Sequence, residues 1–374
     1  MTAPLLAPAL KQGDTIAFLS PSARFNNEFP LFVSRATTLL KHKGYKVLPI
    51  YDPESKEDDN DDIQGSIATR LSEIRSAFTN PSIQAIICTV GGTTFTELVP
   101  HLLADKELQD HIRKNPKIVI GYSDISGLHW FLHATTGLRT FYGPGIIPEL
   151  GLPDNVNDHP DGPLAFCLDN LLKVIERPVA AVGLGNVSRS KSFYPRPMSL
   201  FTEPSKTALP ETAPSPHWVW LRQGQCTGRL FGGCLTVVAR LGGIRGIAPD
   251  WKGRIVFLET ALGDGGDMEK GNPIERVRAG FADLIAQGVF DEAAGLVIGR
   301  PFGYNSEERR RQYMDIIRGL FCKEGSLSAN KNPFPILFGV DIGHTIPMVT
   351  LPFDTLAVLD SEQDRFAILE SAVC

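Results

Sequence analysis

The stretch Lys117–Gly137, KIVIGYSDISGLHWFLHATTG, predicts the strand and the helix around which the rest of the chain is organised. Its first residues, Lys117–Ile120, form a short β-branched apolar run that is typical of a buried strand. Ser126 is a residue type that starts helices, and Gly137 follows the apolar residues as a suitable helix C-cap. We therefore expect Ser123 on a sharp turn that leads from a strand into a helix.

The expected position of Ser123 suits a nucleophile. At such a turn the hydroxyl stands clear of the sheet, beside backbone N–H groups that the first turn of the helix leaves unpaired. Those N–H groups can stabilise an oxyanion while the hydroxyl attacks a carbonyl. The alternative is that Ser123 only helps to cap the helix, and the stretch does not match GxSxG, the nucleophile motif of α/β-hydrolases. A catalytic role therefore needs support from elsewhere in the chain.

The composition is that of an ordinary globular protein and argues against several functions. The 374 residues are 43% hydrophobic and 21% charged, which suits about two domains, each with its own core. A net charge of −5 argues against a nucleic-acid partner. No apolar run approaches the roughly 20 residues that cross a membrane, and the first residues lack the pattern of a signal peptide.

The six cysteines are spread through the chain, with no CxxC pair and no short disulfide framework. Cys88 and Cys234 lie in apolar segments, as buried thiols do. We therefore expect reduced cysteines and a cytoplasmic location.

The first part of the chain alternates predicted strands with predicted helices, which is typical of a parallel sheet covered on both faces. The acidic run Lys56–Asp62 is expected to be a solvated loop, with an acidic lid as the alternative. The predicted strands are Thr15–Ser20, Lys46–Ile50, Ala85–Val90 and Lys117–Ile120, and the predicted helices cover Phe29–Leu40, Ile67–Phe78, the residues after Thr94 as far as Leu103, and the segment after Ser123.

Gly91 and Gly92 form a second candidate site at the end of the predicted strand Ala85–Val90. Paired glycines let the backbone approach a ligand and expose its N–H groups, but they also suit an ordinary tight turn. Neither GxGxxG nor the phosphate-loop motif is present, so a nucleotide-dependent enzyme is a weak alternative. Gly92 and Ser123 are both expected at carboxyl ends of parallel strands, where open α/β sheets bind ligands.

After Gly145 no regular pattern continues, and residues 186–218 are rich in Pro, Ser and Thr. Such a composition is typical of an extended connection or of a flap over a site. The α/β pattern then resumes. We expect an apolar helical pattern over Leu230–Leu241, strands at Arg254–Leu258, Gly295–Ile298, Pro335–Val340, Thr355–Leu359 and Phe366–Leu369, and helices at Ile274–Ala286 and Glu307–Phe321.

A nucleophilic serine requires a base, and the base requires an acid that orients it. Glu259 follows the predicted strand RIVFL, and His344 follows a strand and a glycine in GVDIGHTIP, so both are expected at strand ends. Each residue alone could be structural, but with Ser123 they complete a triad in the order Ser, Glu, His. Asp341 is a second candidate for the acid, although it precedes the base closely in sequence.

His129 and His133 lie four residues apart, a spacing that can bind a metal. No HExxH glutamate and no Cys/His cluster accompanies them, so we expect packing roles for both and no metal site.

Several stretches together resemble the LD-carboxypeptidase family of serine peptidases, especially the branch that contains the microcin C immunity peptidases. They occur in the family's order over nearly the whole chain, and GYSDIS and GHT are its specific motifs. The matching stretches are Ser20-Pro21-Ser22, Val90-Gly91-Gly92, NPKIVIGYSDISGLH, TGLRTFYGP, GRLFGGCLTVVARLGG, IVFLET and DIGHTIPMVTLP.

The resemblance implies that Ser123 is the nucleophile, that His344 is the base and that Glu259 orients the base. The backbone N–H groups of Gly92 and Asp124 are expected to form the oxyanion hole, and no metal or organic cofactor is required. The resemblance also implies a flavodoxin-like parallel-sheet N-terminal domain and a smaller, swivelling α/β C-terminal domain with barrel character. We expect these domains at residues 1–160 and 218–374, joined by a Pro-rich connection or flap at 161–217.

The expected reaction is cleavage of an amide bond in a small peptide or a peptidyl-nucleotide, through an acyl-enzyme. Thr260 and Phe353 depart from the family pattern and leave the substrate undecided. Phe193, Tyr194 or Trp218 could stack on a base if they face the site. A murein-type LD-carboxypeptidase and a non-catalytic, two-lobed ligand-binding protein are the alternatives, and a homodimer is one candidate assembly.

Overall fold

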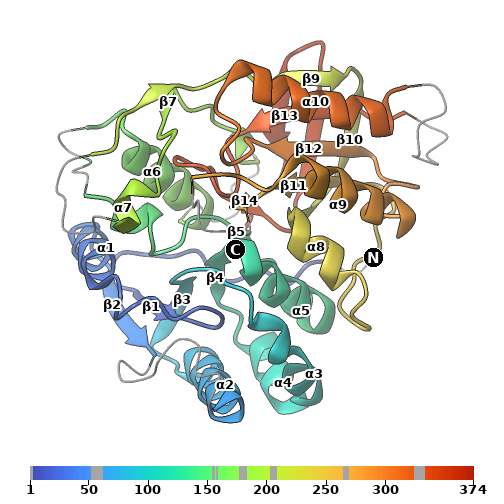
Figure 1. Ribbon diagram of the computed structural model, residues 1–374. Helices are drawn as coiled ribbons and strands as arrows, with labels where there is room; N and C mark the ends of the chain where they lie inside the picture. The colour runs from blue at the N-terminus through green and yellow to red at the C-terminus, as the bar shows by residue number, and fades with distance from the viewer. Residues whose placement is uncertain are drawn as a thin grey trace.

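The computed structural model describes residues 3–51, 62–153, 156, 159–176, 183–202, 209–263, 269–323 and 333–374. Within these residues the chain forms one sheet of six strands and one of eight, with helices packed on both (Figure 1). The acidic run that we expected to be a loop lies outside the described residues except for Asp62. This residue caps helix α2 (Ile63–Thr79) by accepting a hydrogen bond of 2.8 Å from the N–H of Gly65.

The first sheet has the strand order of a doubly wound, flavodoxin-type fold. Strands β2 (Lys46–Ile50), β1 (Thr15–Leu19), β3 (Ile83–Cys88), β4 (Ile118–Gly121) and β5 (Phe141–Tyr142) lie side by side in this order and are parallel. Strand β14 (Leu351–Pro352), from the end of the chain, pairs antiparallel with β5. Because the order reverses between β1 and β3, the carboxyl ends of these strands border the crevice where such folds bind ligands.

Alternate residues of these strands point to opposite faces, and each face has its own layer of helices. Phe18 and Ile87 pack on one face, with helices α1 (Pro30–His42) and α6 (Pro163–Ile175). Leu19 and Ile86 pack on the other face, with α2, α3 (Val99–Ala104), α4 (Lys106–Lys114) and α5 (Ser126–Thr136). Burial on both faces explains why the strands are continuous apolar runs.

The second sheet has a parallel centre and antiparallel edges. Its order is β6 (Gly185–Asn186), β16 (Arg365–Ile368), β15 (Leu356–Asp360), β10 (Gln225–Cys234), β11 (Arg254–Glu259), β12 (Gly295–Gly299), β13 (Ile336–Val340) and β9 (Val219–Arg222), of which β10 to β13 are parallel. Helices α8 (Leu235–Leu241), α9 (Ile274–Ala286) and α10 (Glu307–Phe321) provide the crossovers. The carboxyl ends of β11 and β13 lead into Glu259 and His344.

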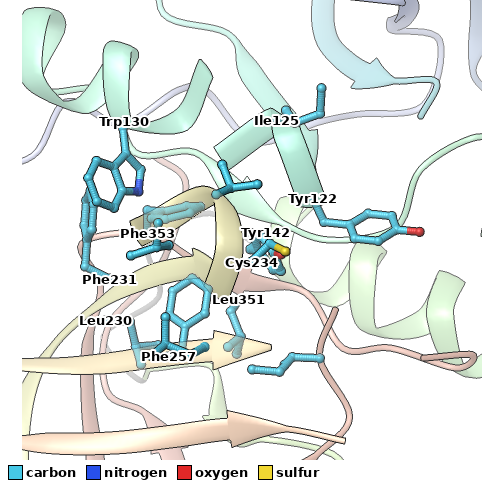
Figure 2. Packing of buried hydrophobic residues seen from close by; sticks show 14 of the residues in the cluster. Tyr122, Ile125, Trp130, Tyr142, Leu230, Phe231, Cys234, Phe257, Leu351 and Phe353 are labelled. Carbon is cyan, nitrogen blue, oxygen red and sulfur yellow. The ribbon is translucent and has the colours of Figure 1, made fainter. Parts of the chain in front are cut away.

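The two sheets share one apolar core at the junction of α5 and β10 (Figure 2). Trp130 of α5 donates a hydrogen bond of 3.0 Å from Nε1 to the carbonyl of Gly232 in β10. Its ring contacts Phe231, which in turn packs edge-on against Phe353. This continuous core sets the turn at Ser123 against the ends of β10 and β11.

The sequence-based prediction missed α4 and β9, and it differs from the structure at two further segments. Helix α6 lies where no regular pattern was apparent, and its apolar residues, including Leu168 and Leu171, pack in the core of the first sheet. The segment Leu230–Cys234, predicted to be helical, is the end of strand β10, and the helix begins only at Leu235. Parallel pairing of this segment with β11 overrides the helical spacing of its apolar residues.

The connection between the sheets contains two paired strands, β7 (Ser192–Phe193) and β8 (Ala213–Pro214), and the one-turn helix α7 (Ser199–Thr202). In the described part of the chain no helix has the length and hydrophobicity needed to span a bilayer.

Candidate active site

Ser123 occupies a strained turn at the end of strand β4. The helical turn Ser123–Ile125 follows the strand directly, and α5 begins at Ser126. The φ angle of Ser123 is 63°, in the left-handed region that non-glycine residues seldom occupy. The hydroxyl of Ser126 donates a hydrogen bond of 2.7 Å to the carbonyl of Ser123 and holds this conformation.

The turn after β3 lies directly against the Ser123 turn. A Cβ atom on Gly91 would lie 2.7 Å from Cβ and 2.9 Å from Oγ of Ser123, so only glycine fits there. Gly92 has a φ of 139°, and a Cβ on it would lie 2.5 Å from Oγ of Ser22, in the turn after β1. No loop or cap hydrogen bond of the described residues uses the N–H of Gly92 or that of Asp124. Three strand ends therefore converge beside Ser123, with two N–H groups available.

The side chain of Asp124 ties these turns together. It is fully buried, and its Oδ2 accepts hydrogen bonds from Oγ of Ser22 (2.7 Å) and from the N–H of Phe95 (2.9 Å). Its Oδ1 accepts from Arg240, which comes from α8 beside the second sheet. The residue after Ser123 is thus held from both halves of the molecule.

Glu259 and His344 form a hydrogen-bonded pair at the ends of β11 and β13. Oε2 of Glu259 accepts hydrogen bonds from Nδ1 of His344 (2.8 Å) and from the N–H of the same residue (3.1 Å). The carboxylate is 1% exposed, whereas the imidazole is partly open to solvent. With Nδ1 directed at the carboxylate, Nε2 is the ring nitrogen that is left to take a proton.

Gly343 makes the close approach of Glu259 to His344 possible. Its φ is 79°, and a Cβ on it would overlap Cγ, Cδ and Oε2 of Glu259, well inside the 3.0 Å that real Cβ atoms keep. The glycine before the histidine therefore makes room for the carboxylate as well as forming the turn.

The environment of Glu259 keeps its carboxylate charged. Burial alone raises the pKa of this group, but His344 and the hydrogen bond from Tyr142 outweigh burial, so the pKa of Glu259 lies below its usual value. A buried carboxylate that remains ionised stabilises a positive charge on the imidazole next to it.

Tyr142 connects the two halves of the site, and the prediction from sequence had not assigned it a role. Its hydroxyl donates a hydrogen bond of 2.6 Å to Oε1 of Glu259 and accepts one of 3.2 Å from the N–H of Ser123. The signal was present in the sequence, since Tyr142 lies in the stretch FYGP that carries the family resemblance. Figure 2 shows Tyr142 next to Cys234 and close to Phe353.

Tyr122 and Glu149 also belong to the site. The ring of Tyr122 packs edge-on against His344, with ring centroids 4.9 Å apart. Its hydroxyl donates a hydrogen bond of 2.8 Å to Glu149, a buried carboxyl whose pKa is raised by burial. Tyr122, held by Glu149, therefore packs against the imidazole of His344.

Ser123, Gly92 and His344 all line one cavity of about 700 Å³, while Glu259 and Asp124 support it from behind. Within the described residues no hydrogen bond joins Ser123 to His344. Catalytic hydrogen bonds of unliganded enzymes are often long and tighten when substrate binds.

The aromatic side chains that could have stacked on a base do not face the site. Phe193 packs against Arg300, Tyr194 is buried, and Trp218 donates a hydrogen bond to Asp341; none of the three lines the cavity. Phe201 of α7 lines it instead, so the connection between the sheets does reach the site.

Among the residues that the structure describes, no hydrogen bond joins the carboxylate of Asp341 to His344. Its carboxylate forms a buried ion pair with Arg300 and accepts a hydrogen bond of 2.6 Å from Oγ of Ser190 in the connection. Asp341 therefore anchors the connection to the second sheet, and these contacts argue against it as the orienting acid.

One group of possible metal ligands was found in the described residues, formed by Cys234, Glu259 and His344 with ligand atoms within 4.8 Å of one another. A metal there would have to displace the hydrogen bond between His344 and Glu259. Burial also raises the pKa of the Cys234 thiol, which keeps it protonated. His129 and His133 have the spacing that can bind a metal. Burial lowers the pKa of each imidazole to about 4.

Comparison with known proteins matches two parts of the chain to two family models. Residues 16–143 match the family model for the LD-carboxypeptidase N-terminal domain, and residues 227–359 match the model for the LD-carboxypeptidase C-terminal domain. The chain is similar to the microcin C7 self-immunity protein MccF of Escherichia coli, with 29% identity over 98% of this chain and 96% of that protein. It is also similar to a probable murein peptide carboxypeptidase of Bacillus subtilis, with 25% identity over 98% of this chain and 94% of that protein.

A solved structure of MccF in complex with aspartyl sulfamoyl adenosine has the same fold. The TM-score is 0.80 at 25% identity, and the match covers 99% of this chain and 100% of that chain.

Proposed function

The chain belongs to the LD-carboxypeptidase family of serine peptidases, and we propose that it cleaves an amide bond of a small peptide or peptidyl-nucleotide with Ser123, His344 and Glu259 as its triad. The observation that carries this proposal is the hydrogen bond of 2.8 Å between His344 and Glu259, in a cavity that Ser123 also lines. An imidazole held by a buried carboxylate beside a serine hydroxyl is the arrangement that serine hydrolysis requires.

In the first step, Nε2 of His344 takes the proton of the Ser123 hydroxyl while Oγ attacks the carbonyl carbon of the scissile amide. The imidazole becomes an imidazolium, which keeps its Nδ1 proton in the hydrogen bond to Glu259. The low pKa of Glu259 ensures that the carboxylate is ionised at neutral pH and stabilises that positive charge.

The oxyanion of the tetrahedral intermediate would bind to the N–H groups of Gly92 and Asp124. Neither group is used in a loop or cap hydrogen bond of the described residues. Asp124 follows Ser123 in the chain, and Gly92 follows Gly91, which lies against the side chain of Ser123. Loss of one such donor typically raises the barrier by about 3–4 kcal/mol.

The tetrahedral intermediate collapses when Nε2 of His344 gives its proton to the leaving nitrogen, which departs as an amine and leaves an ester on Ser123. Water then attacks the ester carbonyl, with His344 again as base, and the acid product and the free serine are formed.

For the substrate, we favour a peptidyl-nucleotide over a cell-wall LD-peptide. The similarity to MccF, which has been solved with aspartyl sulfamoyl adenosine, supports this choice. A cavity of about 700 Å³ with Phe29 and Phe201 in its wall offers room and aromatic surface for a nucleobase. The similarity to a murein peptide carboxypeptidase supports the alternative. The six free cysteines agree with the reducing cytoplasm as the location that we propose.

Labelling with a fluorophosphonate tests whether Ser123 is activated. Wild type should label, whereas S123A should not and H344A and E259Q should label far more slowly. Equal labelling of wild type and S123A, or no labelling together with tight ligand binding, would instead favour a non-catalytic binding protein.

Competition between an LD-tetrapeptide and an aminoacyl sulfamoyl adenosine tests the substrate. We expect a higher kcat/KM for the adenosine conjugate. A clear preference for the tetrapeptide would overturn this choice of substrate and leave the serine mechanism in place.

A further inference from the structure

Arg240 is the one permanently cationic side chain among the described residues that line the cavity. The remaining acidic or basic lining residues are Glu28, Glu149 and His344. An anionic group that enters the cavity therefore finds a single fixed positive charge in this part of its wall.

The structure holds the Arg240 guanidinium in place without using all of its donors. Arg240 lies in the last turn of α8, and within the described residues its side chain makes one hydrogen bond, to Oδ1 of Asp124. Asp124 itself is immobilised by Ser22 and by the N–H of Phe95. The side chain of Arg240 is 41% exposed, so the guanidinium is fixed at one edge and open to the cavity at the other. A guanidinium of this kind is suited to accept a carboxylate or another oxyanion by paired N–H···O hydrogen bonds.

The position of Arg240 relates this charge to the bond that is cleaved. Its hydrogen-bond partner, Asp124, directly follows the proposed nucleophile Ser123 in the chain. The guanidinium is therefore bound to the side chain of the residue next to the nucleophile. Both substrate classes carry an anionic or strongly polar oxygen group next to the scissile nitrogen. In a peptide it is the carboxylate of the residue to be released, and in an aminoacyl sulfamoyl nucleoside it is the sulfonyl group on that nitrogen.

We propose that Arg240 binds this oxyanion group on the leaving side of the substrate and so selects substrates that carry one. The inference rests on the proposed function, because it assumes that Ser123 attacks the amide. The competing explanation is that Arg240 only holds Asp124 and through it the Ser123 turn. The two explanations differ in their dependence on the substrate's charge.

The test compares a peptide that has a free terminal carboxylate with the same peptide as its carboxamide, and an aminoacyl sulfamoyl adenosine as a third ligand. Affinities are measured by titration calorimetry in the S123A background, so that turnover is not needed, and kcat/KM is measured in the wild-type background. The variants are R240Q and R240K. S22A is the matched control, because it removes the other side-chain contact of Asp124 (2.7 Å) and leaves the Arg240 charge intact.

We expect R240Q to weaken the affinity for the carboxylate peptide by about 10²-fold and to change the affinity for the carboxamide peptide by less than about threefold. The variant should therefore no longer discriminate between the two peptides. R240K should retain part of the discrimination, and S22A should affect both peptides equally. An equal loss for acid and amide in R240Q would overturn the inference and assign Arg240 to the support of Asp124. If wild type binds the carboxylate peptide selectively but hydrolyses none of the three ligands, the proposed function fails while the binding role of Arg240 stands. If R240Q weakens only the sulfamoyl conjugate, the anion that Arg240 recognises is the sulfamate and not a carboxylate.

Discussion

Substitution of Gly343 by alanine should break the pair of His344 and Glu259 without touching either residue. The added methyl group would overlap Cγ, Cδ and Oε2 of Glu259, and a buried carboxylate on a rigid strand end has little room to move aside. The methyl group therefore forces the carboxylate away from Nδ1 of His344. The hydrogen bond of 2.8 Å that fixes the tautomer of the base is then lost.

The loss of stability in G343A has two parts, which a control variant at Gly246 separates. Alanine at a left-handed φ costs about 1–2 kcal/mol of stability at both positions, whatever atoms surround it. Gly246 has a φ of 85° and no atom within 4 Å of its hypothetical Cβ, so G246A should show this cost alone. Gly343 has a φ of 79°, and G343A should lose a further 3–5 kcal/mol or so, because Glu259 is displaced from its buried partners.

The assays are urea unfolding for stability and kcat/KM, or the rate of fluorophosphonate labelling, for activity. We expect G343A to lose about 10⁴-fold in kcat/KM, the size of the loss found when the acid of a serine triad no longer orients the base. G246A should remain within about twofold of wild type. The double variant G343A/E259A should be no less active than E259A, since both changes remove the same interaction.

The reasoning would be refuted by a G343A variant that folds and has an activity within tenfold of G246A. In that case Glu259 would not be the residue that orients His344, or the carboxylate would have another position from which it can do so.

Three further changes test other contacts of the site. Y142F removes the hydrogen bond of 2.6 Å to Oε1 of Glu259, so the free energy of unfolding should fall by about 1.5–3 kcal/mol. Because that hydrogen bond lowers the pKa of Glu259, the acidic limb of the pH–activity profile should move to higher pH. An unchanged acidic limb would contradict the link between Tyr142 and the charge of Glu259. D341N removes the buried partner of Arg300 and should cost about 3–5 kcal/mol of stability, but kcat/KM should stay within about tenfold of wild type at a temperature where it is folded; a loss as large as that of E259Q would return Asp341 to the triad. His129 is neutral in the folded state because burial lowers its pKa to about 4, against about 6.5 when unfolded, so its contribution to stability is complete above pH 6.5 and is lost as the pH falls towards 4. Between pH 6.5 and 5.0 this loss is about 2 kcal/mol, and urea titrations of H129Q should show a shallower pH dependence than wild type; parallel curves would contradict it.

Local sequence patterns were sufficient for most elements. The helices Ile274–Ala286 and Glu307–Phe321 and the strand Lys46–Ile50 have the predicted bounds, because their apolar periodicity and end signals agree with their burial. The local pattern failed at Leu230–Cys234, where parallel pairing with β11 decides the conformation, and at Pro163–Ile175, where the surrounding sequence is irregular. In both segments contacts distant in sequence provide the stabilisation.

The sequence alone determined which residue types stand at the strand ends, since a serine, a glutamate and a histidine that follow apolar runs can be recognised without a structure. It also carried the family motifs on which the assignment of the chain depends. Only the tertiary structure decided which of these groups meet. Tyr142 bridges Ser123 and Glu259, Asp341 pairs with Arg300, and Arg240 reaches Asp124 across 116 residues of chain. These contacts follow from strand order and from the packing of one sheet against the other, and neither is encoded in the local spacing of residues, because each depends on burial shared by distant segments.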